Sequence, residues 1–284
     1  MPKEFFSYPE TAPIFTRLEE ASQRSGVSRG QCFEDFLTMS VCCLSGGRME
    51  DLYLQTVAKH TSGKPGKRGC DSLAHMFGEL VAAMEQDTRE GMKDILGDLF
   101  EGAITYGEHQ QYLTPMPVCE MMARLTVGEG GLTAPPDELE SEAATVESSS
   151  SAQDDSVGPT ERKTVYDPCS GSGRMLLAVA QINRHWEFVG RDVDLRCVRM
   201  TALNLAFRSL YGHAIWGNTL ALEQKLVYRT GFDGRGFLRE VPLDMCPVPV
   251  QQVIREPTRP SPTETSEPLA EDASSTPKGQ LRLF

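Results

Sequence analysis

The stretch Val165-Tyr166-Asp167-Pro168-Cys169-Ser170-Gly171-Ser172-Gly173-Arg174-Met175-Leu176-Leu177 decides the fold of this chain. A short apolar strand runs into a turn rich in Gly and Ser, and the turn runs into an apolar helix. Glycines let the backbone approach a ligand closely, and the first turn of the helix directs its amides toward the same point. The stretch therefore predicts a strand–turn–helix unit that binds a ligand.

Residues 163–220 alternate between strands and helices around this turn. Apolar runs predict strands at 165–166, 186–189 and 214–216, and helices at 176–182 and 195–210. Strands separated by single helices imply a parallel sheet with right-handed crossovers. We find no clear strand after residue 220, so we expect an α/β fold with a shortened sheet. The first strand would then have an open edge, which the segment Lys225–Arg229, the N-terminal helices or a second subunit could cover.

Residues 10–105 have helical periodicity. Apolar side chains recur at helical spacing over the ranges 14–21, 33–44, 52–58, 73–84 and 95–104. Ser28 is placed to cap the second of these helices, and Asp71 or Ser72 to cap the fourth. We therefore expect an all-helical N-terminal domain over residues 1–108, followed by an α/β domain built from residues 109–127 and 163–253.

The formal charge of −12 is concentrated in two segments of the chain. Residues 128–160 hold eight acidic residues and no Lys or Arg, and residues 256–279 carry a net charge of −3. Both segments are poor in large apolar groups, so we expect a disordered acidic insertion at 128–162 and a disordered tail at 254–284. The rest of the chain is close to neutral, which leaves DNA open as a partner.

The loop at residues 62–69 holds three basic residues, Lys64, Lys67 and Arg68, next to glycines and without an acid. Such a loop is either a solvated surface loop or a contact for DNA phosphates, since Lys and Arg beside flexible glycines can reach a DNA backbone. The residues leave both interpretations open.

The eight cysteines form no CxxC pair and no Cys/His spacing typical of zinc. The first residues lack the apolar core of a signal peptide, and no apolar run approaches the roughly 20 residues that span a bilayer. We therefore expect reduced thiols, no metal ion, no membrane contact and a cytoplasmic location.

Five segments follow one another in the order of a known family: Asp94–Glu101, Gln111–Pro115, Asp167–Gly173, Val189–Asp194 and Gly217–Leu220. Together they resemble the N-6 adenine DNA methylases, above all the modification subunit of type I restriction systems. Members of that family have a helical N-terminal domain and a Rossmann-like methyltransferase domain that uses S-adenosylmethionine (SAM). The resemblance implies SAM as the cofactor, DNA as the substrate, and methyl transfer to adenine N6 in a restriction-modification system.

The resemblance also implies roles for individual residues. Asp167 would meet the amino group of the methionine, Gly171 and Gly173 would allow close backbone approach, and Asp192 would accept hydrogen bonds from the ribose. The alternative role of Asp192 is a helix cap, although Asp194 is better placed for it. Tyr112, Thr114 and Pro115 would close over the methionine, and Asn218 after the third strand would lie near the adenine. The whole implied cofactor set is Tyr112, Thr114, Pro115, Asp167, Pro168, Cys169, Ser170, Gly171, Ser172, Gly173, Asp192 and Asn218.

The family's catalytic signature, Asn- or Asp-Pro-Pro followed by Tyr or Phe, does not occur in this sequence. In the family it accepts hydrogen bonds from the adenine amino group and stacks on the flipped base. Asp244 or the turn Pro247–Pro249 could substitute for it. Otherwise the chain is an inactive SAM-binding or DNA-associated accessory protein, or a half-enzyme that needs a specificity or complementing subunit. No catalytic residue is assigned.

The last five residues, Gln280-Leu281-Arg282-Leu283-Phe284, resemble the pentapeptide by which proteins bind the bacterial β sliding clamp. Leu283 and Phe284 offer adjacent apolar groups to a hydrophobic pocket, and Gln280 can form hydrogen bonds at a second subsite. The alternative is a frayed end without a partner. The expected partners are thus DNA, the clamp, a further subunit and a second copy of the chain.

Overall fold

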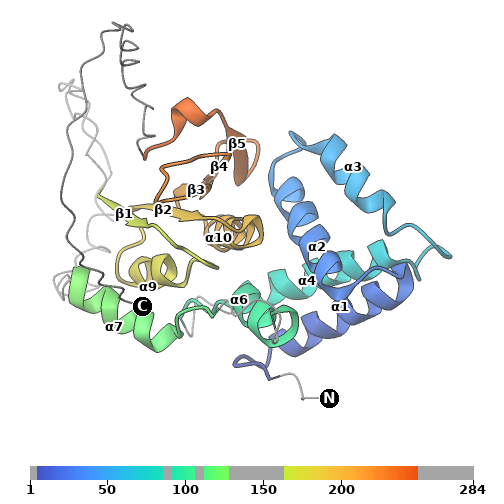
Figure 1. Cartoon of the computed structure of the whole chain (residues 1–284). Helices are drawn as coiled ribbons and strands as arrows, with labels where there is room; N and C mark the ends of the chain where they lie inside the picture. The colour runs from blue at the N-terminus through green and yellow to red at the C-terminus, as the bar shows by residue number, and fades with distance from the viewer. Residues whose placement is uncertain (1–4, 86–90, 106–111, 128–162, 249–284) are drawn as a thin grey trace, which may run out of the picture. The chain divides into compact units, whose positions relative to one another are not determined.

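A computed structural model describes residues 5–85, 91–105, 112–127 and 163–248, all within one compact unit of the chain. The expected acidic insertion at 128–162 and the tail with its terminal pentapeptide lie outside these residues. Figure 1 shows a group of helices at the N-terminal side of this unit and a sheet with further helices at the other. None of the described helices is long and apolar enough to cross a membrane.

Four helices occupy the first part of the chain: α1 (Thr11–Ser25), α2 (Arg29–Leu44), α3 (Glu50–Ala58) and α4 (Gly69–Glu85). The predicted cap of α2 is confirmed, because Ser28 Oγ accepts a hydrogen bond from the amide of Gln31 at 3.3 Å. The predicted caps of α4 are wrong. The helix begins before Asp71, whose carboxylate reaches back to the amide of Arg68 at 2.8 Å, as an acid in the first turn of a helix often does.

The predicted helix at 95–104 changes type halfway. It begins as α6 (Ile95–Leu99), capped by Asp94, and continues as the wider π-helical turn η1 (Phe100–Ile104). The amide of Thr105 accordingly bonds to the carbonyl of Phe100, five residues back. Such π turns are rare and often lie at functional sites. The next described helix is α7 (Met116–Val127).

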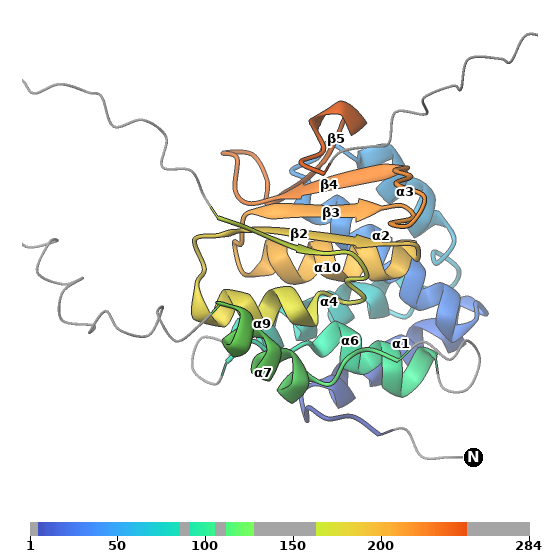
Figure 2. The same ribbon diagram turned by 60° about the vertical axis from the view of Figure 1, so that its left-hand side comes forward.

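The sheet has five strands in the order β1-β2-β3-β4-β5. They are β1 (Thr164–Asp167), β2 (Glu187–Asp192), β3 (Gly212–Trp216), β4 (Leu226–Thr230) and β5 (Leu238–Val241). Strands β1 to β3 run parallel, joined by α9 (Arg174–Ile182) and α10 (Leu195–Phe207). The predicted strands and helices of this region are all present, with ends that differ by up to three residues. Figure 2 shows α9 and α10 side by side along one face of the sheet.

The hairpin of β4 and β5 was not expected from the sequence. Only nine residues, 217–225, connect β3 to β4, whereas a parallel crossover needs about a dozen or more, so β4 returns antiparallel to β3. The prediction that Lys225–Arg229 could cover the first strand is therefore wrong, because this segment pairs with β3 on the opposite side of the sheet. Among the described strands, β1 has a neighbour on one side only. A short helical turn at Leu243–Met245 follows β5.

One hydrophobic core joins the N-terminal helices to the sheet. Phe33 and Leu37 of α2 and Met76 of α4 belong to the same buried cluster as Leu203 of α10 and Tyr228 of β4. Burial of apolar area is the main stabilising contribution to folding, so these two groups of elements stabilise each other. The core thus crosses the expected domain boundary at residue 108.

Candidate functional site

A cavity of about 280 Å³ lies where the parallel strands end. Asp167 reaches it from the end of β1, Asp192 from the end of β2, and Gly171 from the turn between β1 and α9. The amide of Gly171 donates a hydrogen bond to Asp192 Oδ2 at 2.9 Å. The glycine turn and the acid of the second strand therefore adjoin each other, at the edge where open α/β sheets bind their ligands.

The glycine turn depends on backbone conformations that favour glycine. Gly171 has φ +53° and Gly173 has φ +92°. A Cβ atom on Gly171 would lie 2.6 Å from Leu113 Cδ2, so a side chain there would displace the end of the Leu113 side chain. The amide of Gly173 bonds to the carbonyl of Ser170 at 2.7 Å and closes the turn. The backbone conformation of this turn therefore favours glycine at both positions.

The two carboxylates in the cavity are partly desolvated. Burial is the main cause that raises the pKa of Asp167, and the neighbouring charge of Asp192 raises it further. Burial also raises the pKa of Asp192, whose oxygens accept hydrogen bonds from the amides of Gly171 and Asp194 at 2.9 Å each. Asp194 itself caps α10 through the amide of Arg196, so Asp192 is not the helix cap. Each carboxylate oxygen keeps a lone pair for a ligand.

A salt-bridged arginine holds one wall of the cavity in place. Arg174 Nε lies 2.7 Å from Asp94 Oδ2, and its Nη2 lies 2.7 Å from Glu101 Oε2. Glu101 Oε1 accepts a hydrogen bond from the amide of Leu113 at 2.8 Å, while Arg174 Nη1 donates to the carbonyl of Thr114 at 3.3 Å. This network fixes the segment of Leu113 and Thr114 against the glycine turn.

Asp94 is the centre of this network and is completely buried. Besides Arg174, its carboxylate accepts hydrogen bonds from the amide of Gly97, the hydroxyl of Ser172 and the amide group of Asn204. A buried charge is costly unless it is paired and hydrogen-bonded, and Asp94 meets both conditions. One carboxylate thus joins α6, the glycine turn and α10.

The structure brings most of the predicted cofactor residues to this cavity. Eight of them line it: Tyr112, Thr114, Asp167, Cys169, Ser170, Gly171, Ser172 and Asp192. The other four, Pro115, Pro168, Gly173 and Asn218, are not among the lining residues. The side-chain oxygen of Asn218 instead accepts hydrogen bonds from the amides of Leu220 and Ala221 and stabilises the turn after β3.

The cavity is also lined by four residues for which the sequence predicted no role, namely Leu113, Arg174, Met175 and Cys197. The position of Arg174 in the sequence does carry a signal. A cation in the first turn of a helix opposes the helix dipole, which indicates that acids lie nearby. Asp94 and Glu101 are seven residues, or about two helical turns, apart, so a helix places them on one side.

The three basic residues that were predicted to contact DNA phosphates differ in their surroundings. Lys64 and Lys67 are exposed to solvent. The guanidinium group of Arg68 instead forms a two-pronged ion pair with Asp71, with Nε–Oδ2 and Nη2–Oδ1 distances of 3.2 and 2.9 Å. The clamp-binding residues Gln280, Leu281, Leu283 and Phe284 lie outside the described part of the chain.

Comparison with known families identifies this region. The family described as N-6 DNA Methylase matches residues 91–233, which is half of the chain and includes Asp94, the glycine turn and Asp192. Searches of the curated proteins and of the solved structures found no match. The family match and the cavity coincide in sequence, and the chain therefore belongs to the N-6 DNA methylase family.

Proposed function

We propose that this protein binds SAM between Gly171 and Asp192 and methylates the N6 atom of adenine in DNA. One observation carries the proposal: Asp167, Gly171 and Asp192, which lie on different segments, converge on a single cavity at the carboxyl edge of the sheet. Membership of the N-6 DNA methylase family supplies the reaction class. We further propose that the activity is cytoplasmic and of the restriction-modification type.

The residues around the cavity fit SAM by charge and by shape. An ammonium group beside Asp167 would offset the desolvation of that carboxylate, and Asp192 has lone pairs for two ribose hydroxyls. The volume of about 280 Å³ is close to the lower end of the range for small-molecule sites. When bound, SAM supplies a methyl group on a positively charged sulfur.

The chain's own residues hold the cofactor cavity in shape. Arg174 and Glu101 fix the backbone at Leu113 and Thr114, so this wall is ordered before a ligand arrives. Such preorganisation lowers the entropy that binding would otherwise lose. Tyr112, which is 87% exposed, lies at the rim, where it is free to close over a ligand.

A second candidate function is a half-enzyme, or a SAM-binding accessory protein, that depends on a partner for contacts to the adenine. Two observations favour it. The sequence has no Asn- or Asp-Pro-Pro-aromatic signature, and β1 has no second neighbour among the described strands. We propose that a specificity or complementing subunit, or a second copy of this chain, would supply the missing contacts.

Titration calorimetry with SAM, followed by transfer of a labelled methyl group to mixed-sequence DNA, tests these proposals. Binding together with turnover supports the methyltransferase, and binding without turnover by the isolated chain supports the second candidate. Asp192→Ala should weaken SAM binding at least tenfold, whereas the exposed control Glu223→Gln should not change it. Absence of SAM binding by the wild-type chain would overturn both.

We also propose that the terminal pentapeptide 280–284 recruits the protein to a sliding clamp. The resemblance of Gln280-Leu281-Arg282-Leu283-Phe284 to the clamp-binding pentapeptide supports it. Replacing both Leu283 and Phe284 by Ala in the full chain should abolish clamp binding in a surface-immobilised assay and leave SAM binding unchanged. Unchanged clamp affinity of this variant contradicts the proposal.

A further inference from the structure

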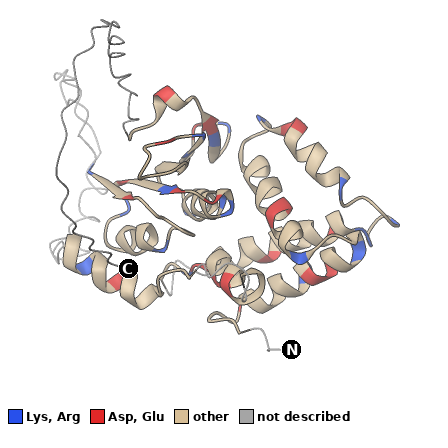
Figure 3. Ribbon diagram, in the orientation of Figure 1, with Lys and Arg blue, Asp and Glu red and all other residues tan. Residues whose placement is uncertain are grey.

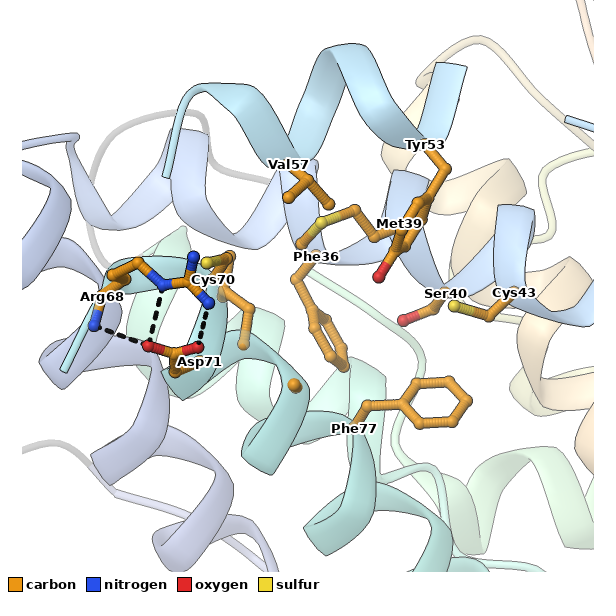
Figure 4. Close-up of a pocket in the computed structure, with 12 residues that line it drawn as sticks. Phe36, Met39, Ser40, Cys43, Tyr53, Val57, Arg68, Cys70, Asp71 and Phe77 are labelled. Carbon is orange, nitrogen blue, oxygen red and sulfur yellow. Dashed lines mark hydrogen bonds and ion pairs between the residues drawn. The ribbon is translucent and has the colours of Figure 1, made fainter. Parts of the chain in front are cut away.

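A second cavity, of about 320 Å³, lies among the helices α2, α3 and α4 (Figure 4). The rings of Phe36 and Phe77 and the side chain of Met39 form its middle part. The ion pair of Arg68 and Asp71 lies at one end. The cavity therefore combines an apolar centre with polar ends.

The end opposite this ion pair carries hydroxyl groups. Figure 4 shows the hydroxyls of Ser40 and Tyr53 directed toward the same part of the cavity. Ser40 is 1% exposed, and its Oγ atom has no hydrogen-bond partner among the described residues. A buried hydroxyl without a partner is unfavourable, so this end is suited to a ligand that carries a hydrogen-bonding edge.

Two exposed lysines precede Arg68, which lines the cavity, in the sequence. Lys64 and Lys67 belong to the loop that leads into α4, and Figure 3 shows basic residues along this loop. Both side chains are exposed, and neither forms an ion pair with any residue in the described ranges. They are therefore available to an anionic group connected to whatever enters the cavity.

This cavity is separate from the one at the glycine turn. Phe77, which lines it, packs against the ring of Phe207 at the last residue of α10, with the ring centroids 5.7 Å apart, as is usual for aromatic pairs. Cys197, which lines the cavity at the glycine turn, lies near the start of the same helix. Ten residues of helix separate the two positions, or about 15 Å.

We propose that the cavity among α2, α3 and α4 binds an unpaired nucleobase of DNA, while Lys64 and Lys67 contact the adjoining phosphates. A base has flat apolar faces for Phe36 and Phe77 and a hydrogen-bonding edge for the hydroxyls of Ser40 and Tyr53. Aromatic rings that stack on bases next to cations that follow the backbone are the usual means of binding single strands. A purely apolar ligand would leave Ser40 unsatisfied, and a free anion would not use the apolar centre.

The inference rests on the DNA-directed function proposed above, and it adds a nucleotide contact distant from the SAM site. The position also decides which nucleotide is bound. The two cavities share no lining residue, so a base in the second cavity would not be the one that is methylated, and this cavity would hold a neighbouring nucleotide of the strand.

Fluorescence anisotropy of the full chain with a labelled single-stranded oligonucleotide, and with its duplex, tests the inference. Ala74 is an exposed residue of α4 that lines the cavity, so Ala74→Trp should fill it and weaken single-strand binding at least fivefold. The matched control is His75→Trp, at the next position, which is also exposed but does not line the cavity. The same binding with 2-aminopurine in the strand should show a change in base fluorescence that Ala74→Trp removes and His75→Trp keeps.

The surface variant Lys64→Gln/Lys67→Gln tests the phosphate contacts without altering the core. Loss of two contacts to a single strand should lower the slope of log affinity against log salt by about 1.4. The control Lys163→Gln/Lys225→Gln changes the net charge equally elsewhere and should keep the slope. Equal binding by Ala74→Trp and His75→Trp, or equal slopes for the two lysine pairs, would overturn the inference. SAM calorimetry on the same variants, expected to be unchanged, separates this result from the fate of the SAM proposal.

Discussion

Arg174 and Asp94 form an ion pair of 2.7 Å in which the carboxylate is fully buried and the arginine side chain is 11% exposed. The two residues are 80 positions apart in the sequence, yet they connect the helix after the glycine turn to the start of α6. Removal of one partner from such a pair leaves the other charge buried and uncompensated. This pair is therefore where the helical part of the chain determines the shape of the cavity at the glycine turn.

Arg174→Gln should destabilise the protein by about 3 kcal/mol, because Asp94 would keep its neutral donors but lose its counter-charge. The urea midpoint of unfolding measures this change. Hydrogen exchange of the Leu113 amide, which Glu101 binds, should accelerate in the same variant. Arg196→Gln is the matched control, since Arg196 pairs with Asp194 at a more exposed position and should cost about 1 kcal/mol or less. Similar losses in both variants would contradict the role assigned to Arg174.

Gly171→Ala should weaken SAM binding at least tenfold, because the new Cβ would displace the Leu113 side chain that lines the cavity. It should also destabilise the fold by about 1 to 2 kcal/mol, since φ is positive there. Gly66→Ala separates the two effects. Gly66 has φ +83°, but an added methyl group would have no atom within 4 Å, so calorimetry should find SAM binding unchanged. If Gly66→Ala also weakened SAM binding, the contact with Leu113 would not explain the weaker SAM binding of Gly171→Ala.

SAM affinity should fall on acidification at a higher pH than an ordinary aspartate would cause. Burial raises the pKa of Asp167 and Asp192 above the ordinary value of 3.8, and both carboxylates must be charged to bind a cation and to accept hydrogen bonds. Their charged forms are disfavoured by folding, so their contribution to stability decreases as the pH rises through the raised pKa values. Asp167→Asn should therefore bind SAM at least tenfold more weakly while being at least as stable as the wild type at pH 7. Calorimetry across the acid range measures the fall in SAM affinity, and thermal unfolding measures the stability of the Asp167→Asn protein. An Asp167→Asn protein that is less stable than the wild type would contradict the raised pKa of Asp167.

Cys169 should be a reactive thiol that SAM protects. It is exposed and lines the cavity, whereas burial raises the pKa of Cys32, Cys42 and Cys119 to about 11, where little thiolate forms at neutral pH. Labelling with a thiol reagent, read out by peptide mass, should modify Cys169 and spare those three. Added SAM should slow the labelling of Cys169 but leave that of Cys43, an exposed thiol outside this cavity, unchanged. Equal protection of both thiols would point away from this cavity as the SAM site.

Local patterns in the sequence predicted the strand–turn–helix unit and the parallel strands β1 to β3, because each of these depends on neighbouring residues. The hairpin was missed since β4 and β5 are short and show no regular alternation of apolar and polar residues, as in Leu226–Thr230 and Leu238–Val241. This pattern resembles an exposed loop until the pairing with β3 is known. A strand of this kind is specified by the elements around it more than by its own composition.

The contacts of Arg174 could not be derived from sequence for a different reason. The acids that bind it, Asp94 and Glu101, belong to another part of the chain, and no periodicity connects residues more than 70 positions apart. The convergence of Asp167 and Asp192 could be predicted because parallel strands place their carboxyl ends at one edge. The sequence therefore predicts which residues a parallel sheet brings to one edge, but it does not predict which residues of separate helices form ion pairs.

The single carboxylate of Asp94 has a consequence for how the protein can be divided. A fragment that begins after residue 105 would retain the glycine turn but lose the acid that anchors Ser172, Arg174 and Asn204. The smallest autonomous folding unit therefore reaches back at least as far as residue 94, and excising the sheet alone would yield the glycine turn without its scaffold.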